Sequence, residues 1–232
     1  MNKKVLIVAA HPDDEVLGCG GIIAKYRSEG DDVRVLFLAE GVTSRYSNDE
    51  LSKQHVLEEI ARRNKNAIIA LNILSVDSSQ IFTNKERYCC RFDQIHQLDL
   101  VKEIEKHISE WHPTHLYTHS PNDVNIDHRV TYQAVLAATR PISSSTLLEI
   151  YSFEVLSSTE WNTLKPFMAN TFIDISRYID LKISAMEAYE GELREEPHPR
   201  SKSSIEALSR YRGAQSGLQY AEAFSLVRML KL

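Results

Sequence analysis

The sequence is poor in cysteine and has no long hydrophobic run. Its 232 residues include three cysteines, Cys19, Cys89 and Cys90. An odd count with an adjacent pair is a poor disulfide framework and favours a reducing compartment. No apolar run reaches the roughly 18 residues that a membrane span needs. Met1 to Lys4 lead straight into an apolar run, with no room for a signal peptide. These absences predict a cytoplasmic protein.

An excess of positive charge is also missing. The 27 lysines and arginines are outnumbered by 32 aspartates and glutamates, which gives a formal net charge of −5. Because nucleic-acid-binding proteins carry a basic field, we expect no nucleic-acid partner. The hydrophobic fraction of 43% is enough for a full core, and the length suits one large domain.

Short apolar runs alternate with amphipathic stretches along the chain. Strands are expected at 3–10, 33–39, 71–76, 114–118, 147–153 and 171–175, and helices at 16–29, 49–70, 99–111, 127–138, 180–189 and 204–213. The stretch 78–91 is expected to be irregular. This alternation predicts an α/β fold, with a mostly parallel sheet between helices on both faces, in a single domain over residues 1–232. We expect 190–232 to be a packing or substrate-loop extension, and 218–232 to offer an exposed apolar edge to a homo-oligomer.

The most informative stretch joins the first expected strand to the first expected helix. His11, Asp13 and Asp14 lie in this turn, at the carboxyl end of the strand. In an open α/β sheet that edge is where ligands bind. A histidine and two carboxylates in one turn form half of a metal site.

A second polar cluster follows the strand expected at 114–118. It contains Asp123, Asn125, Asp127 and His128, with Asp127 placed to cap the following helix. Singly, each cluster is explained equally well as a loop with a capped helix. Together they supply two imidazoles and a carboxylate, which is the ligand set of a catalytic zinc site with one open position.

The two clusters together support hydrolytic chemistry. His11, Asp14 and His128 are the predicted ligands of an ion that lowers the pKa of a bound water to roughly 7. Asp13, in the same turn, is placed to act as the general base on that water. Asp127 is placed to hold an imidazole as an outer hydrogen-bond acceptor. The reaction class that follows is metal-assisted hydrolysis of an amide or ester.

Three glycines, Gly18, Gly20 and Gly21, superficially suggest the phosphate-binding loop of a dinucleotide site. They fall inside the expected helix, and the turn before it is filled by carboxylates, which repel a pyrophosphate. We expect these glycines to let the helix pack closely on the sheet. Cys19, among them, is interpreted as a packing residue.

These motifs resemble those of the LmbE-like or PIG-L-type zinc-dependent de-N-acetylases. Residues 10–15, Ala-His-Pro-Asp-Asp-Glu, are similar to the first motif of that family, and Asp127-His128 to its second. Supporting similarities lie late in the chain, at 172–176, Lys182, 188–189 and 220–224. The resemblance implies a Rossmann-like fold and removal of an acyl group from an amino sugar. It also implies zinc on His11, Asp14 and His128, with Asp13 as the base.

Two positions depart from the family pattern. Many members have a histidine, which helps to stabilise the oxyanion or protonate the amine, where this chain has Asn125. An amide cannot supply a proton at neutral pH, so the proton would come from Asp13, His119 or His198. The substrate-binding arginine of the family has no clean counterpart. Arg62 and Arg63 are nearest and are interpreted as solvated charges.

The predicted substrate is an N-acetylated amino sugar or its nucleotide- or lipid-linked conjugate, used in glycan or glycolipid synthesis, with peripheral membrane contact where the carrier is a lipid. Two other hypotheses stand beside it. One is an amidase on a thiol conjugate or a deformylase, and the other is a metal-holding sugar-binding protein without turnover. The predicted residues are Asp13, Asp127 and His119 as catalytic groups, Asn125, Arg45, Arg200 and His198 as substrate-binding groups, and His11, Asp14 and His128 as zinc ligands.

Overall fold

The structure is a computed structural model that describes residues 2–77, 81–88, 90–142 and 146–231. Over these residues the strands form one seven-stranded sheet in the order β3-β2-β1-β4-β5-β7-β6. The first five strands in this order run parallel, and β7 runs antiparallel to both of its neighbours. The strands are β1 (Lys4–Ala9), β2 (Asp32–Ala39), β3 (Ile81–Tyr88), β4 (His115–His119), β5 (Glu149–Phe153), β6 (Thr171–Asp174) and β7 (Ala221–Met229).

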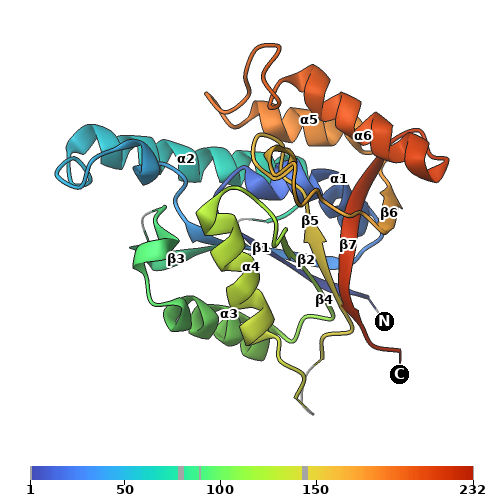
Figure 1. Cartoon of the computed structure of the whole chain (residues 1–232), viewed down its shortest axis with the longest axis horizontal. Coiled ribbons are helices and arrows are strands. Elements are labelled where there is room, and N and C mark those ends of the chain that lie inside the picture. Colours follow the sequence, from blue (N-terminus) through green and yellow to red (C-terminus); the bar gives the residue numbers. More distant parts are fainter. Residues whose placement is uncertain (1, 78–80, 89, 143–145, 232) are drawn as a thin grey trace.

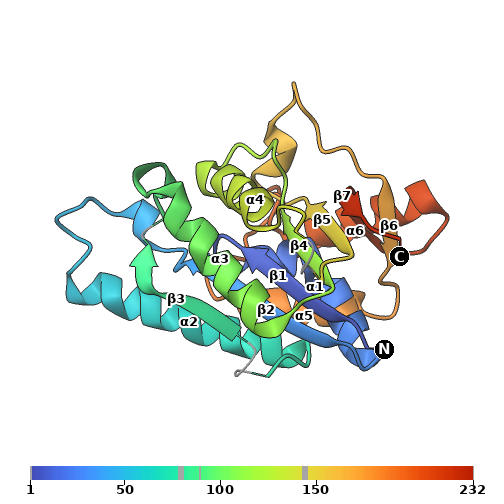
Figure 2. The same ribbon diagram turned by 90° about the horizontal axis from the view of Figure 1, so that it is seen from below.

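Helices cover both faces of this sheet, as predicted (Figures 1 and 2). One face carries α1, α2, α5 and α6, and the other carries α3 and α4. Their bounds are α1 Asp14–Ser28, α2 Gln54–Ile73, α3 Gln97–Trp111, α4 Ile126–Ala138, α5 Ile179–Glu187 and α6 Lys202–Ser216. None of these helices, nor any other in the described part of the chain, has the length and apolar character needed to cross a membrane.

The central strand β1 shows why both faces are covered. Val5 and Ile7 belong to the buried core under α1 and α5, whereas Leu6 and Val8 belong to the core under α3 and α4. Successive strand residues point to opposite faces, so a continuous apolar run requires apolar partners on each side. Because β1, β2, β4 and β5 run parallel, their carboxyl ends lie at one edge of the sheet, and both polar clusters lie at this edge.

The strand expected at 71–76 is wrong. Helix α2 continues to Ile73 because Ala67, Ala70, Leu71 and Leu74 repeat at helical spacing and are all buried. The strand that follows is instead β3, inside the stretch expected to be irregular. Only its first three residues, Ile81-Phe82-Thr83, favour a strand, and four polar or charged residues follow them, so its backbone pairing with β2 defines it. Tertiary pairing thus decided this element.

The exposed apolar edge expected at 218–232 is wrong for most of the stretch, and of its described residues only Met229 and Leu230, near the end, are exposed large hydrophobic residues. Most of this stretch forms β7, which pairs with β5 on one side and β6 on the other. Residues 221–224 are buried in the sheet. Helix α6 packs beside β7, so residues 202–229 are integral to the main layers of the fold.

The close packing expected of the glycines in α1 is confirmed. A Cβ atom at Gly18 would lie 2.3 Å from a ring carbon of Phe153, and one at Gly21 would lie 2.6 Å from Ile175. Because real Cβ atoms do not approach so closely, any larger residue would push α1 away from β5. Helix α1 starts in the first polar cluster, so these contacts help to position that cluster.

A buried ion pair also holds helix α1 in place. The Lys182 Nζ atom lies 2.6 Å from Glu222 Oε1 and also donates to the Leu17 carbonyl at 2.8 Å. The Glu222 carboxylate accepts from the backbone N–H groups of Gly21 and Ile22, each at 2.8 Å. The pair therefore joins α5 and β7 to the middle of α1.

Lys182→Met is expected to lower the free energy of unfolding by about 3–5 kcal/mol, because it leaves a buried carboxylate without its countercharge. Urea unfolding followed by circular dichroism measures the change. Lys202→Met is the matched control, since Lys202 pairs with Glu187 at an exposed position. A loss no larger than that of the control would show that the buried pair contributes no net stability.

Candidate active site

The turn after β1 brings the first cluster into a tight arrangement. The backbone N–H of His11 donates to Asp14 Oδ2 at 2.9 Å, and His11 Nδ1 lies 3.3 Å from the same oxygen. Asp13 has a φ of 115°, a value that residues other than glycine rarely adopt. Such backbone strain is found at functional sites, where the surrounding structure maintains it. Here it separates the directions of two neighbouring carboxylates.

The second cluster completes the ligand group from helix α4. His128 Nε2 lies 3.2 Å from Asp14 Oδ2. Ligand atoms of His11, Asp14 and His128 all lie within 4.8 Å of one another. His128 Nε2 is buried and has no hydrogen-bond donor or acceptor partner among the described residues. A buried orphan nitrogen facing a carboxylate fits an ion at this position, so the structure brings the predicted zinc ligands together.

Each of the two imidazoles is oriented by its own carboxylate. Asp123 Oδ2 lies 3.0 Å from His128 Nδ1 and accepts hydrogen bonds from the Ser158 and Thr159 hydroxyls. Asp127 Oδ2 lies 3.0 Å from His11 Nε2. This is the outer-acceptor position predicted for Asp127, and Asp123 occupies the equivalent position on the other histidine.

Asp127 does not cap helix α4, contrary to expectation. The cap is Asn125, whose side-chain oxygen accepts from the Asp127 N–H at 2.9 Å. The Asp127 carboxylate turns toward the site and also accepts from the backbone N–H of Phe92 at 2.8 Å. The cap lies two residues earlier than expected, which frees Asp127 for His11. The Asn125 amide oxygen is used by the helix itself.

Without an ion, the ligand group holds protons. Burial opposes charge on His128, but the Asp14 and Asp123 carboxylates outweigh it and raise its pKa to about 9. Burial likewise opposes charge on Asp14, yet the charge of His128 holds the pKa of its carboxyl well below the ordinary value. Because a metal must displace the imidazole proton, binding will release protons.

Asp123→Asn is expected to weaken zinc binding by roughly 10- to 100-fold, the usual cost of losing an outer-shell carboxylate. The amide cannot stabilise the imidazole as the carboxylate does, although it still accepts the Ser158 and Thr159 hydroxyls. Competition with a chromogenic chelator measures the affinity. Asp99→Asn, at an exposed position in α3, is the control. Equal affinities in both variants would contradict the orienting role of Asp123.

Two arginines form ion pairs with Asp13, the predicted base. Asp13 Oδ2 accepts from Arg63 at 3.2 Å and from Arg200 at 3.0 Å. Burial raises the pKa of the Asp13 carboxyl, while the charges of Arg200 and Arg63 oppose that rise. Arg63 is buried and also donates to the Pro12 carbonyl, so its interpretation as a solvated charge is wrong. Position 63 lies on the inner face of α2, which the spacing of Ile60 and Ala67 indicates in retrospect.

Glu192 connects these arginines and was missed by sequence analysis. This buried carboxylate contacts Arg63, Arg200 and Arg45. Burial opposes its charge, but Arg63 and Arg45 lower the pKa of Glu192 below its ordinary value. No local motif marks Glu192, since only the folded chain brings it to Asp13.

The predicted substrate-binding groups occupy different positions around the site. Arg200 lies in the site, on Asp13, and its Nε donates to the Ser157 hydroxyl at 2.6 Å. Arg45 is half-exposed at the rim, between Glu59 and Glu192. His198 Nδ1 accepts from the backbone N–H of Arg200 at 3.0 Å. His198 therefore shapes the loop that presents Arg200.

His119 is buried behind the ligand group. Its ring stacks on His128 with centroids 4.0 Å apart, and its Nε2 accepts from the Ala10 N–H at 2.8 Å. Burial lowers the pKa of His119 well below its ordinary value, and the charge of His128 adds to this effect. The ring is thus held neutral with its proton on Nδ1. This geometry favours packing support for His128 over the predicted role as a proton donor.

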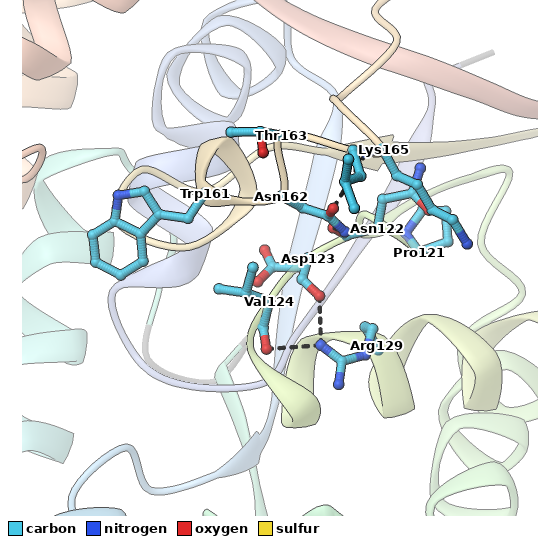
Figure 3. A pocket seen from close by; sticks show the side chains of 10 residues that line it. Pro121, Asn122, Asp123, Val124, Arg129, Trp161, Asn162, Thr163 and Lys165 are labelled. Atoms are coloured by element: carbon cyan, nitrogen blue, oxygen red, sulfur yellow. Dashed lines mark hydrogen bonds between the residues drawn. The ribbon is translucent and has the colours of Figure 1, made fainter.

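A hollow of about 430 Å³, shown in Figure 3, is lined in part by Asp123, the residue that orients His128. It lies between residues 121–124 and residues 161–165, with Arg129 from α4. Asp123 connects the hollow to the ligand group. Its side chain contacts His128, and its backbone carbonyl accepts a hydrogen bond from Arg129 at 2.6 Å. Figure 3 shows Trp161 at one end and Lys165 at the other, and 55% of the Trp161 surface is exposed.

The fold and the ligand group together define a class of site. Two histidines and an aspartate lie at the carboxyl edge of a parallel sheet, with a buried carboxylate as the next residue to a ligand. Such a group could hold a metal ion with a carboxylate beside it. The chain belongs to the PIG-L family, described as GlcNAc-PI de-N-acetylase, whose sequence profile matches residues 6–139.

Curated relatives are deacetylases. The chain is 27% identical to the diacetylchitobiose deacetylase of Thermococcus kodakarensis in an alignment 241 positions long. The alignment covers 97% of this chain and 83% of that protein. It is also 25% identical to the 1D-myo-inositol 2-acetamido-2-deoxy-alpha-D-glucopyranoside deacetylase of a Mycobacterium species. That alignment covers 85% of this chain and 77% of the relative.

Solved structures share the fold. The N,N'-diacetylchitobiose deacetylase of Pyrococcus horikoshii aligns with a TM-score of 0.76 at 19% identity, covering 97% of this chain and 84% of that chain. The 4-carboxy-2-hydroxymuconate hydratase GalB of Pseudomonas putida aligns with a TM-score of 0.74 at 20% identity, over 99% and 98% of the two chains. A hydratase and a deacetylase thus share this fold, and the side chains of the site must identify the reaction.

Proposed function

We propose that this protein is a zinc-dependent N-deacetylase that removes the acetyl group from an amino sugar or its conjugate. One observation carries the proposal. The ligand atoms of His11, Asp14 and His128 lie within 4.8 Å of one another, and the residue before Asp14, Asp13, is a buried carboxylate that pairs with two arginines. The deacetylase relatives support the substrate class, because the two named above act on acetylated amino sugars.

Zinc held by His11, Asp14 and His128 would supply an acidified water and polarise the acetamide carbonyl. Asp13 is placed to take the proton of the attacking water. Arg63 and Arg200 keep the acceptor carboxylate in place from one side. The proton then passes from Asp13 to the amine nitrogen as the C–N bond breaks, which gives acetate and a free amine. Asn125 cannot donate this proton.

The hollow beside the site supports a substrate larger than a free monosaccharide. Trp161 offers an exposed aromatic face, and Lys165 and Arg129 bring positive charge to the walls. The volume of about 430 Å³ lies in the range of small-molecule sites. We place the conjugated part of the substrate in this hollow, where Trp161 stacks on a ring. A nucleotide-linked or glycoside conjugate fits these walls.

The proposal is tested by metal content and acetate release measured on one preparation. The panel is N-acetylglucosamine, its nucleotide conjugates, its glycosides and its lipid-linked forms. We expect about one zinc per chain, release that a chelator abolishes and zinc restores, and faster release from a conjugate than from the free sugar.

Each other result selects a different function. Bound zinc and saturable sugar binding without release from any substrate would favour the binding protein. Release from a thiol conjugate or a formamide alone would favour the amidase or deformylase.

Trp161→Ala should raise KM for the conjugate but not for the free sugar. Equal effects on both substrates would contradict the placement of the conjugate in the hollow.

A cytoplasmic location and a homo-oligomer stay predictions.

A further inference from the structure

His11 faces two groups of metal-binding atoms. Its Nδ1 points to Asp14, in the zinc site proposed above, and its Nε2 lies 3.0 Å from Asp127 Oδ2. A third side chain, Cys90, lies close to this pair. Ligand atoms of His11, Cys90 and Asp127 lie within 4.8 Å of one another, the same limit that the atoms of the proposed zinc site meet.

Cys90 is held in this position by its surroundings. It is a free, buried cysteine with 8% of its surface exposed. Its backbone N–H donates to the Thr43 hydroxyl at 3.0 Å, and its thiol donates to Glu40 Oε2 at 3.5 Å. Glu40 is itself fixed by the backbone N–H of Val42 at 2.8 Å. The thiol therefore has little freedom to turn away from His11, and a carboxylate adjoins it.

We propose that His11 Nε2, Cys90 Sγ and an Asp127 oxygen form a second cation site, which takes thiophilic divalent ions and inhibits the enzyme when filled. A set of thiolate, imidazole and carboxylate donors suits Zn²⁺ or Cd²⁺ and disfavours Mg²⁺ or Ca²⁺. Binding releases the thiol proton of Cys90 and the Nε2 proton of His11 to solvent. This inference rests on the proposed function because His11 also serves the zinc site.

Filling this site disturbs the zinc site through the shared imidazole. Asp127 orients His11 by accepting its Nε2 proton, and an ion at the second position removes that hydrogen bond. The imidazole then bridges two cations, which places an added positive charge beside the reaction. The second site is also the weaker one, because its ion must displace two protons and an existing hydrogen bond.

Cadmium binding to the metal-free protein tests the site without any substrate. Equilibrium dialysis should find two Cd²⁺ ions per wild-type chain and one in Cys90→Ser. The ultraviolet thiolate-to-cadmium charge-transfer band should be present in wild type and absent in Cys90→Ser. Cys19→Ser and Cys89→Ser, which keep the thiol count equal to that of Cys90→Ser, should retain both the band and the second ion. A single ion in wild type, or a band that persists in Cys90→Ser, overturns the proposal.

Zinc inhibition tests the consequence. Each protein is compared with its own activity at one equivalent of zinc. Wild type should lose activity as free zinc rises, and Cys90→Ser should need roughly 10-fold more zinc for half-inhibition, since it lacks one donor. Equal inhibition of both proteins overturns the inhibitory role while the deacetylase proposal stands. If no substrate is hydrolysed, the cadmium experiment still decides whether the second site exists.

Discussion

Asp13→Asn protein is expected to retain zinc and to lose roughly 10²- to 10⁴-fold in kcat, the usual contribution of a positioned general base. The amide keeps the shape of the carboxylate and still accepts from Arg63 and Arg200, but it cannot take a proton from water. Asparagine also tolerates the positive φ at this position better than most residues. Acetate release and zinc content, measured on the same sample, check the result.

The control for this variant is Asp180→Asn, at an exposed position in α5. It makes the same chemical change away from the site and should leave kcat unaltered. Thermal unfolding shows whether Asp13→Asn has kept its fold. Acetate release at the wild-type rate from folded Asp13→Asn would exclude Asp13 as the base and direct attention to another group.

Asp14→Asn is expected to weaken zinc binding by more than about 100-fold, beyond the usual loss for an outer-shell partner. Asp14 Oδ2 is the atom that both imidazoles approach, at 3.3 Å from His11 and 3.2 Å from His128. Removing its charge leaves two neutral ligands and no anion to balance the ion. Activity should fall with metal content and recover only partly at high zinc.

Thermal unfolding with and without zinc gives an independent measure of the same loss. Zinc at about 1,000 times its Kd would stabilise the wild-type fold by about 4 kcal/mol. Asp14→Asn should show almost none of this gain at the same concentration, and exposed Asp99→Asn should show all of it. A full zinc-dependent shift in Asp14→Asn would place the ion elsewhere, with the Cys90 group as the first alternative.

The arginines show a further property of this site. Arg63 and Arg200 both bind Asp13, and Glu192 shares their charge. The proposed base is therefore not an isolated carboxylate. The arginines compensate its charge, and Glu192 shares their contacts. Burial still raises the pKa of Asp13, so the carboxyl is a better proton acceptor than a solvated one.

The sequence by itself determined the parallel core and the grouping of the proposed ligands at its edge. Continuous apolar strands require helices on both faces, so β1, β2 and β4 were predictable from local pattern. The carboxyl ends of such strands meet at one edge, which brings His11 and His128 together whatever the loops do. These features depend on short-range periodicity and on a general property of parallel sheets.

Tertiary structure decided the rest, because long-range contacts leave little local signal. β3 has only a short apolar start and is defined by its pairing with β2, and β7 is defined by its insertion between β5 and β6. Glu192 contacts Arg63 and Arg200, the partners of Asp13, only in the folded chain, because these residues are far apart in the sequence. Asn125 shows the same limit: the motif marks its position, but only the folded helix shows that its oxygen caps α4.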